Sequence, residues 1–203
     1  KMPREAVTGM RSSLCLLGAL LGRCGEVNME YPGGCVIGER PIDLHLSALK
    51  QMGVAFSEEK GQLRAVARKL HGACIALPFP SVGATENIIL AGVAAQGETI
   101  LEGAAREPEI LTLCRYLRCC GACIEGAGSS RIVIRGGRRL CGTEFKVQAD
   151  RIVAGTYLLG CIGAGGSVFL EQAPAEEMRA VLLAAEEMGG HMCISRDGLY
   201  VQA

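Results

Sequence analysis

A repeat with a period of 68 residues constrains the fold of this chain more than any other feature of its sequence. Three helical patterns each end in a glycine that is followed by a short strand, and these glycines are Gly53, Gly121 and Gly189. A glycine just past the last helical turn readily takes the left-handed conformation that ends a helix. The chain is therefore expected to consist of three copies of one structural module.

The spacing of apolar residues predicts the elements of each module. Each helix has one apolar face, formed by Ile42, Leu46, Leu49 and Met52, by Ile110, Leu113, Cys114 and Leu117, and by Met178, Val181, Leu182, Ala185 and Met188. Each of these helices starts near a proline, at Pro41, Pro108 or Pro174. Two short strands follow each glycine, at 54–56 and 63–66, at 123–125 and 131–134, and at 192–195 and 199–201.

A second, more apolar helix precedes each of these units, at 10–21, 85–95 and 152–162, and leads into a strand such as 99–101 or 167–170. The module is thus helix, strand, helix, strand, strand. This order predicts an α/β fold of repeated units that bury their helices against a shared interior. Glycines such as Gly160 and Gly163 predict close packing of the more apolar helices.

Composition excludes several classes of protein. Of the 203 residues 49% are hydrophobic, which is enough to bury a core, and Lys plus Arg equals Asp plus Glu at 21 each. The chain has no net charge and no Trp. It therefore lacks both the positive electrostatic field and the aromatic surfaces for base stacking that nucleic-acid binding uses. No apolar stretch is long enough to cross a membrane, so we expect no membrane partner.

The 11 cysteines are an odd number spread through apolar segments, which favours a reduced, cytoplasmic protein. The cluster Cys119, Cys120 and Cys123 lacks a second pair or a histidine at zinc-ligand spacing, and the three histidines share no spacing, so we predict no metal site and no cofactor. His45 is placed on the polar part of its helix, without a catalytic role. Because the chain begins at Lys1, we expect a piece of a longer polypeptide.

Cys35 stands in a glycine-lined loop five residues before Arg40, ahead of the helix that Pro41 and Asp43 are expected to open. A thiol near a helix start and a guanidinium has its thiolate stabilised, so Cys35 could act as acid, base or nucleophile. The alternative is that Cys35 is one more buried cysteine, but the chemistry of the loop favours the reactive interpretation.

Other polar residues have structural and functional interpretations. The turn Ser81–Val82–Gly83 opens a helix and either caps it or cradles an anion on free backbone amides. Taken alone, Arg11 is interpreted as a charged side chain on the surface. Glu107 is interpreted as a carboxylate that suits the start of a helix, and Asp150–Arg151 as a pair of linker residues.

Taken together, these segments resemble the UDP-N-acetylglucosamine enolpyruvyl transferase family over nearly the whole chain. The motifs that carry the resemblance are 10–13, 32–45, 81–85, 104–110 and 150–156, and the motif around the cysteine is the most specific. The resemblance implies two domains, each an inside-out α/β barrel of three such repeats, with the active site between them. This chain would hold two repeats of one domain (1–149) and one repeat of the other (150–203).

The resemblance also implies the activity, which is transfer of the enolpyruvyl group of phosphoenolpyruvate to the 3-hydroxyl of UDP-N-acetylglucosamine in peptidoglycan synthesis, without a cofactor. Cys35 would be the general acid and the target of fosfomycin. Arg11 and Arg40 would bind phosphoenolpyruvate. The UDP-sugar would contact Arg40, Pro41, Ile42, Asp43, Leu44, Ser81, Val82 and Gly83, and Glu107, Asp150 and Arg151 would lie at the cleft.

Several alternatives stay open at this point. A 5-enolpyruvylshikimate-3-phosphate synthase would share the repeats but lacks this cysteine loop. A noncatalytic UDP-sugar-binding fragment is also possible, because the remaining half of the enzyme is needed to complete the cleft and Val153 stands where the family usually has an acid. A cysteine-based redox or metal protein would require the cluster around Cys120 to bind a metal.

Overall fold

The structure, a computed structural model, describes residues 4–33, 41–59 and 61–203. It divides into two compact units, residues 1–145 and 146–203, called here the N-terminal and C-terminal units. The sequence-based boundary between 149 and 150 lies four residues later. Each unit is described by itself below.

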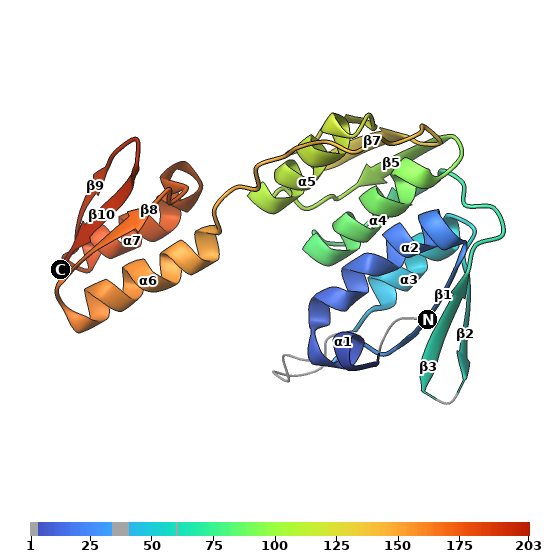
Figure 1. Ribbon diagram of the computed structural model, residues 1–203, viewed down its shortest axis with the longest axis horizontal. Coiled ribbons are helices and arrows are strands. Elements are labelled where there is room, and N and C mark those ends of the chain that lie inside the picture. Colours follow the sequence, from blue (N-terminus) through green and yellow to red (C-terminus); the bar gives the residue numbers. More distant parts are fainter. Residues whose placement is uncertain (1–3, 34–40, 60) are drawn as a thin grey trace. The chain divides into compact units, whose positions relative to one another are not determined.

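The N-terminal unit contains two copies of the module. After α1 (Arg4–Gly9), the first consists of the 3-10 helix η1 (Arg11–Cys15), α2 (Leu16–Cys24), β1 (Glu26–Glu30), α3 (Asp43–Gln51), β2 (Ala55–Glu59) and β3 (Gln62–Val66). The second consists of β4 (Cys74–Ala76), α4 (Val82–Ala94), β5 (Glu98–Glu102), α5 (Pro108–Cys119), β6 (Cys123–Glu125) and β7 (Arg131–Arg135). Figure 1 shows α2, α3 and α4 packed side by side.

The C-terminal unit is the third copy. It consists of α6 (Arg151–Ala164), β8 (Ser167–Glu171), η2 (Ala175–Met178), α7 (Arg179–Glu187), β9 (His191–Ile194) and β10 (Gly198–Gln202). Among the described residues every copy has the same antiparallel strand order, β1-β3-β2, β5-β7-β6 and β8-β10-β9, and β4 adds to β5 in parallel. The predicted α/β class and the threefold repeat are confirmed.

Local chemistry explains why the elements end where they do. Gly53, Gly121 and Gly189 have φ values of +88°, +102° and +92°, the left-handed conformation predicted for them. The helix expected at 10–21 begins instead as η1, where the Ser13 hydroxyl donates to the carbonyl of Met10 at 2.7 Å. It then continues as α2 to Cys24, where Gly25 at φ +71° ends it.

Each of the two units has a hydrophobic core of its own. One core, with Leu17, Leu49, Ile88 and Ile134 among its buried residues, fills the N-terminal unit, and a separate, smaller one around Leu158 and Leu199 fills the C-terminal unit. The first two copies therefore bury their helices against a shared interior within the N-terminal unit.

Glycine-mediated packing occurs on α2 rather than on α6. A Cβ on Gly18 would collide with the backbone carbonyl of Asn87, and one on Gly22 would collide with Ala94, so α2 and α4 approach closely. A Cβ on Gly160 or Gly163 would meet no atom within 4 Å. The prediction of close packing at Gly160 and Gly163 is therefore wrong within the described residues.

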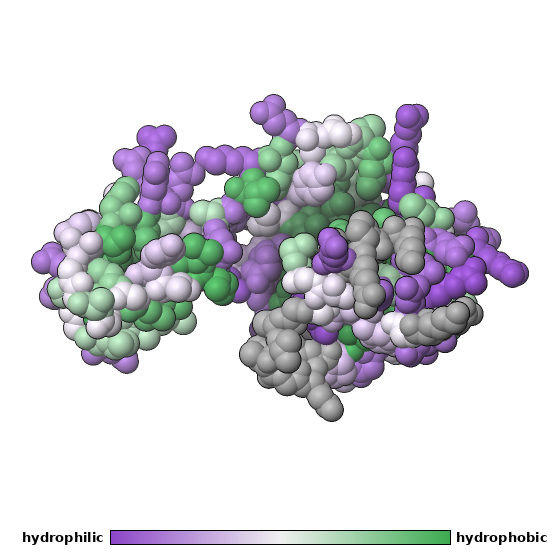
Figure 2. Space-filling view, turned by 60° about the horizontal axis from the view of Figure 1, so that its bottom comes forward, coloured by the Kyte–Doolittle hydropathy of each residue, from purple (hydrophilic) through white to green (hydrophobic). Residues whose placement is uncertain are grey.

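The C-terminal unit exposes many large apolar side chains, and Figure 2 shows broad hydrophobic areas on it, at the left of the view. They include Ile152, Val153, Tyr157 and Leu159 of α6, and Met188, which is 62% exposed although its helix pattern placed it in the core. Met188 is the residue after the last turn of α7, so its side chain has left the buried face. No helix among the described residues combines the length and the apolar character needed to span a membrane.

Candidate functional site

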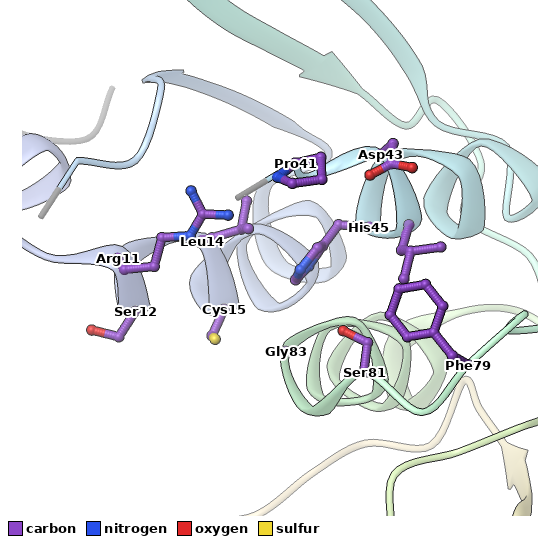
Figure 3. A pocket seen from close by; sticks show the side chains of 11 residues that line it. Arg11, Ser12, Leu14, Cys15, Pro41, Asp43, His45, Phe79, Ser81 and Gly83 are labelled. Carbon is purple, nitrogen blue, oxygen red and sulfur yellow. The ribbon is translucent and has the colours of Figure 1, made fainter. Parts of the chain in front are cut away.

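A cavity of about 340 Å³ lies in the N-terminal unit, where three separate segments meet. Figure 3 shows the side chains that line it, which come from η1, the start of α3 and the start of α4. They are Arg11, Ser12, Leu14, Cys15, Pro41, Asp43, Leu44, His45, Phe79, Ser81 and Gly83.

The structure brings together most of the described residues that were predicted to bind ligands. Arg11, half-buried, lines the same cavity as Asp43, Leu44, Ser81 and Gly83. η1 carries Arg11 along the wall of the cavity, which favours the ligand-binding interpretation of Arg11 over that of a plain surface charge. The cavity therefore contains both the Arg11 guanidinium and the N-terminus of a helix, a combination that suits an anion.

Five other predicted residues do not line the cavity. Ile42 is buried at the N-cap of α3, and Val82 packs against the core. Glu107 is the N-cap of α5, with one carboxylate oxygen buried and without a hydrogen-bond partner among the described residues. The Asp150 carboxylate caps α6 by accepting from the amide of Ile152 at 2.7 Å, and Arg151 begins that helix in the C-terminal unit.

The prediction that Pro41 occupies the first position of a helix is also corrected. The helix α3 begins at Asp43 with Ile42 as its N-cap, so Pro41 precedes the helix and its exposed ring lies at the rim of the cavity. Cys35 and Arg40, which come before this segment in the sequence, lie outside the described residues.

The start of α4 combines a cap with free amides. The Ser81 hydroxyl accepts from the amide of Ala84 at 3.4 Å, and the Ser81 carbonyl accepts from the amide of Thr85 at 2.9 Å. Within the described part of the chain, no hydrogen bond engages the amides of Val82 or Gly83. The turn therefore caps the helix and still presents two donors.

Sequence reasoning missed Cys15, although Arg11, Leu14 and Cys15 have the spacing of one helix face. The Cys15 thiol donates to the carboxylate of Glu86 at 2.9 Å. Burial, and then the Glu86 carboxylate, raise the pKa of Cys15 from 9.0 to about 12. Cys15 is therefore a protonated, weakly nucleophilic thiol at neutral pH.

His45 is the clearest departure from expectation. It is 7% exposed rather than on a polar face, because α4 packs over the side of α3 that carries it. Burial and the nearby Arg11 charge lower the pKa of His45 from 6.5 to about 4, although Asp43 partly opposes this. The imidazole is therefore neutral at physiological pH.

His45 should make the protein less stable in mild acid. Since its pKa is lower in the folded state, its contribution to stability is complete above pH 6.5 and is lost as the pH falls from 6.5 through 4, by an amount on the order of 3 kcal/mol. Urea unfolding at pH 7 and pH 4.5 measures this, with His45→Asn as a control that removes the titrating group. An identical pH dependence for the two proteins contradicts the prediction.

A metal centre is not found in the described ranges, since no group of three or more His, Cys, Asp and Glu residues there could hold an ion. Cys119 and Cys123 flank the buried Cys120 without forming such a group. The described side chains that line the cavity include the guanidinium of Arg11, the carboxylate of Asp43, the protonated thiol of Cys15 and the neutral imidazole of His45.

Comparison with known proteins adds an independent line of argument. The model of the family described as EPSP synthase (3-phosphoshikimate 1-carboxyvinyltransferase) matches residues 1–197. The chain is 48% identical over 197 residues to the UDP-N-acetylglucosamine 1-carboxyvinyltransferase of Nitratidesulfovibrio vulgaris strain DP4. It is 47% identical over 203 residues to the protein of the same name from Zymomonas mobilis. These matches cover 97% and 99% of this chain but 47% and 48% of the relatives, so the chain spans about half the length of the curated relatives it matches.

Two solved structures confirm the fold. The enolpyruvyl transferase NikO from Streptomyces tendae superimposes with a TM-score of 0.78 at 21% identity, covering 100% of this chain and 49% of that one. An EPSP synthase from Acinetobacter baumannii gives a TM-score of 0.66 at 25% identity, covering 95% of this chain and 46% of that one.

Proposed function

The chain belongs to the EPSP synthase (3-phosphoshikimate 1-carboxyvinyltransferase) family, and from that premise we propose that the full-length protein is a UDP-N-acetylglucosamine enolpyruvyl transferase. It transfers the enolpyruvyl group of phosphoenolpyruvate to the 3-hydroxyl of UDP-N-acetylglucosamine and releases phosphate. The reaction belongs to peptidoglycan synthesis and takes place in the cytoplasm. The ten cysteines of the described residues, all free thiols, support a reducing compartment.

The observation that carries this proposal is the identity of 48% to a UDP-N-acetylglucosamine 1-carboxyvinyltransferase. The alternative, a 5-enolpyruvylshikimate-3-phosphate synthase, is favoured by the name of the family model, but the EPSP synthase structure reaches only 25% identity. The high identity extends over nearly the whole chain. This favours the UDP-sugar over shikimate 3-phosphate as acceptor.

The geometry of the cavity suits the proposed ligands. Arg11 offers a planar, permanently charged donor that can grip phosphoenolpyruvate through two hydrogen bonds. The amides of Val82 and Gly83, beside Ser81, suit a diphosphate at the N-terminus of α4, a helix of 13 residues. Pro41, Asp43 and Leu44, which line the cavity, would then hold the uridine end of the nucleotide sugar together with Arg40.

Cys35 is proposed as the general acid that protonates the vinyl carbon of phosphoenolpyruvate, and as the residue that fosfomycin alkylates. A thiol with a pKa near neutral both gives and takes a proton efficiently. The sugar hydroxyl would add to the neighbouring carbon and lose its proton, and loss of phosphate together with one proton of the new methyl group would restore the vinyl group on the sugar.

The remaining half of the enzyme is proposed to complete the cleft, with Glu107, Asp150 and Arg151 at its edges. The exposed apolar side chains of α6 support this, because the equivalent helices α2 and α4 bury theirs against each other. A further repeat packed on α6 would cover Ile152, Val153 and Tyr157 in the same way.

Phosphate release tests the proposed function. The full-length protein should release phosphate from phosphoenolpyruvate when UDP-N-acetylglucosamine is present, and not when shikimate 3-phosphate replaces it. A colorimetric phosphate assay measures this, and mass spectrometry of the product locates the enolpyruvyl group. Release with shikimate 3-phosphate alone establishes the alternative, and release with neither acceptor contradicts both.

Replacing Arg11 by Lys tests the assignment of the cavity in the same assay. Lysine keeps the charge but loses the paired hydrogen bonds, so the KM for phosphoenolpyruvate should rise at least about tenfold. Arg23→Lys, on the exposed last turn of α2, is the matched control and should behave like the wild type. An unchanged KM in Arg11→Lys removes Arg11 from the site.

A further inference from the structure

Asn87 holds three segments of the N-terminal unit together. Its side chain is fully buried on α4, and its amide oxygen accepts from the backbone N–H of Gly18 at 2.7 Å. Its amide nitrogen donates to the carbonyl of Leu14 at 2.9 Å. Because Gly18 can only donate and the Leu14 carbonyl can only accept, these two contacts fix the orientation of the Asn87 amide.

This orientation determines the tautomer of His45. The Asn87 amide nitrogen also lies 2.8 Å from Nδ1 of His45. An amide nitrogen is a donor only, so Nδ1 must accept and carries no proton. The neutral ring therefore bears its hydrogen on Nε2.

The Nε2 edge of the ring lies at the N-terminal end of α4. A Cβ placed on Gly83 would be 3.0 Å from Cε1 and 3.4 Å from Nε2 of His45, so the ring edge lies against Gly83. Figure 3 shows the ring reaching from α3 toward Gly83 and Ser81 in the lining of the cavity. Within the described part of the chain, Nε2 has no hydrogen-bond partner of its own.

We propose that His45 is a specificity-determining residue of the nucleotide-sugar site, which donates from Nε2–H to a phosphate oxygen of the bound nucleotide beside Gly83. This inference rests on the proposed function, because it takes the ligand at the start of α4 to be a diphosphate. The donor is neutral, so it adds a directed hydrogen bond next to the guanidinium of Arg11 without adding repulsion. Asn87 contributes by holding the ring in the donating tautomer.

Two substitutions separate this role from a structural one. Asparagine carries its amide near the position of ring Nδ1, so His45→Asn can keep a partner for Asn87 but loses the donor at the cavity. Glutamine carries its amide near the position of Nε2, so His45→Gln can keep the donor but leaves Asn87 without its acceptor. Of the two variants, His45→Asn should therefore bind the nucleotide sugar more weakly, whereas His45→Gln should be the less stable.

The test titrates UDP-N-acetylglucosamine into the full-length protein by calorimetry and measures thermal unfolding of the same samples. His45→Asn should bind about tenfold more weakly, whereas His45→Gln should bind within about threefold of the wild type and unfold at the lower temperature of the two. Nitrogen-15 spectra of the histidine ring should show the proton on Nε2.

Three results would overturn the assignment. The first is wild-type affinity in His45→Asn, and the second is an affinity that follows the unfolding temperature in both variants. The third is a proton on Nδ1. These outcomes leave the proposed function standing, because the wild type still binds the nucleotide sugar. A wild type that binds no UDP-N-acetylglucosamine is a different result, and it overturns the proposed function and the role of His45 together.

Discussion

Replacing Cys35 by alanine in the full-length protein should lower kcat for enolpyruvyl transfer by about 10²–10⁴-fold, the usual loss when a general acid is removed. The loss is expected because alanine has no proton to deliver to the vinyl carbon, which is the role proposed for the Cys35 thiol. The phosphate-release assay measures the effect. Cys74→Ala removes an exposed thiol of β4 that does not line the cavity, and should leave kcat unchanged.

Fosfomycin provides a second readout of the same prediction. A peptide mass spectrum of the treated protein should place the adduct on Cys35 and leave Cys15 unmodified. Cys15 lines the cavity, but burial and Glu86 hold its pKa near 12, so almost no thiolate is present at neutral pH. An adduct on Cys15, or none at all, counts against the role proposed for Cys35.

Replacing Gly18 by alanine should destabilise the N-terminal unit by about 2–5 kcal/mol. The new methyl group would collide with the backbone carbonyl of Asn87, which cannot rotate away as a side chain could. Moving α2 away from α4 would also break the contacts of Asn87 with Gly18 and Leu14. Faster amide hydrogen exchange in α2 and α4, followed by mass spectrometry, measures the loss.

Gly160→Ala in the 203-residue chain is the matched control. Gly160 is also inside a helix, but a Cβ there meets no atom within 4 Å, so alanine should stabilise α6 by about 0.5–1 kcal/mol. We expect amide hydrogen exchange in α2 to become faster in Gly18→Ala, and amide hydrogen exchange in α6 to become slower in Gly160→Ala. Equal slowing in both variants means that α2 and α4 do not pack as closely as described.

Periodicity predicted the elements well because each depends on nearby residues. The strand pair at 123–125 and 131–134 agrees with β6 and β7 to within one residue, and the glycine that ends each helix adopts the expected conformation. Apolar spacing also identified the buried face of α5, with Ile110, Cys114 and Leu117 at most 4% exposed.

The errors concern contacts between distant segments, which periodicity does not contain. His45 reads as a polar helix residue until α4 brings Asn87 against it, 42 positions away in the chain. Gly160 reads as a packing site like Gly18, but only Gly18 has a helix against it here. Which residues are buried therefore depends on contacts between distant segments, and these contacts cannot be predicted from the periodicity of a single sequence.

The turn at Ser81 shows that two interpretations of a motif need not exclude each other. Capping uses the Ser81 hydroxyl and the amide of Ala84, whereas anion binding would use the amides of Val82 and Gly83. A serine-capped helix start is thus compatible with a diphosphate site. Its proximity to Arg11 and His45, visible only in three dimensions, is what favours the functional interpretation.

The cavity draws Arg11, Asp43 and His45 from the first repeat and Ser81 and Gly83 from the second. A single module would supply only one wall of this cavity and no opposing wall. Neither repeat alone could therefore form the proposed ligand site, which requires two copies of the module side by side and different side chains from each.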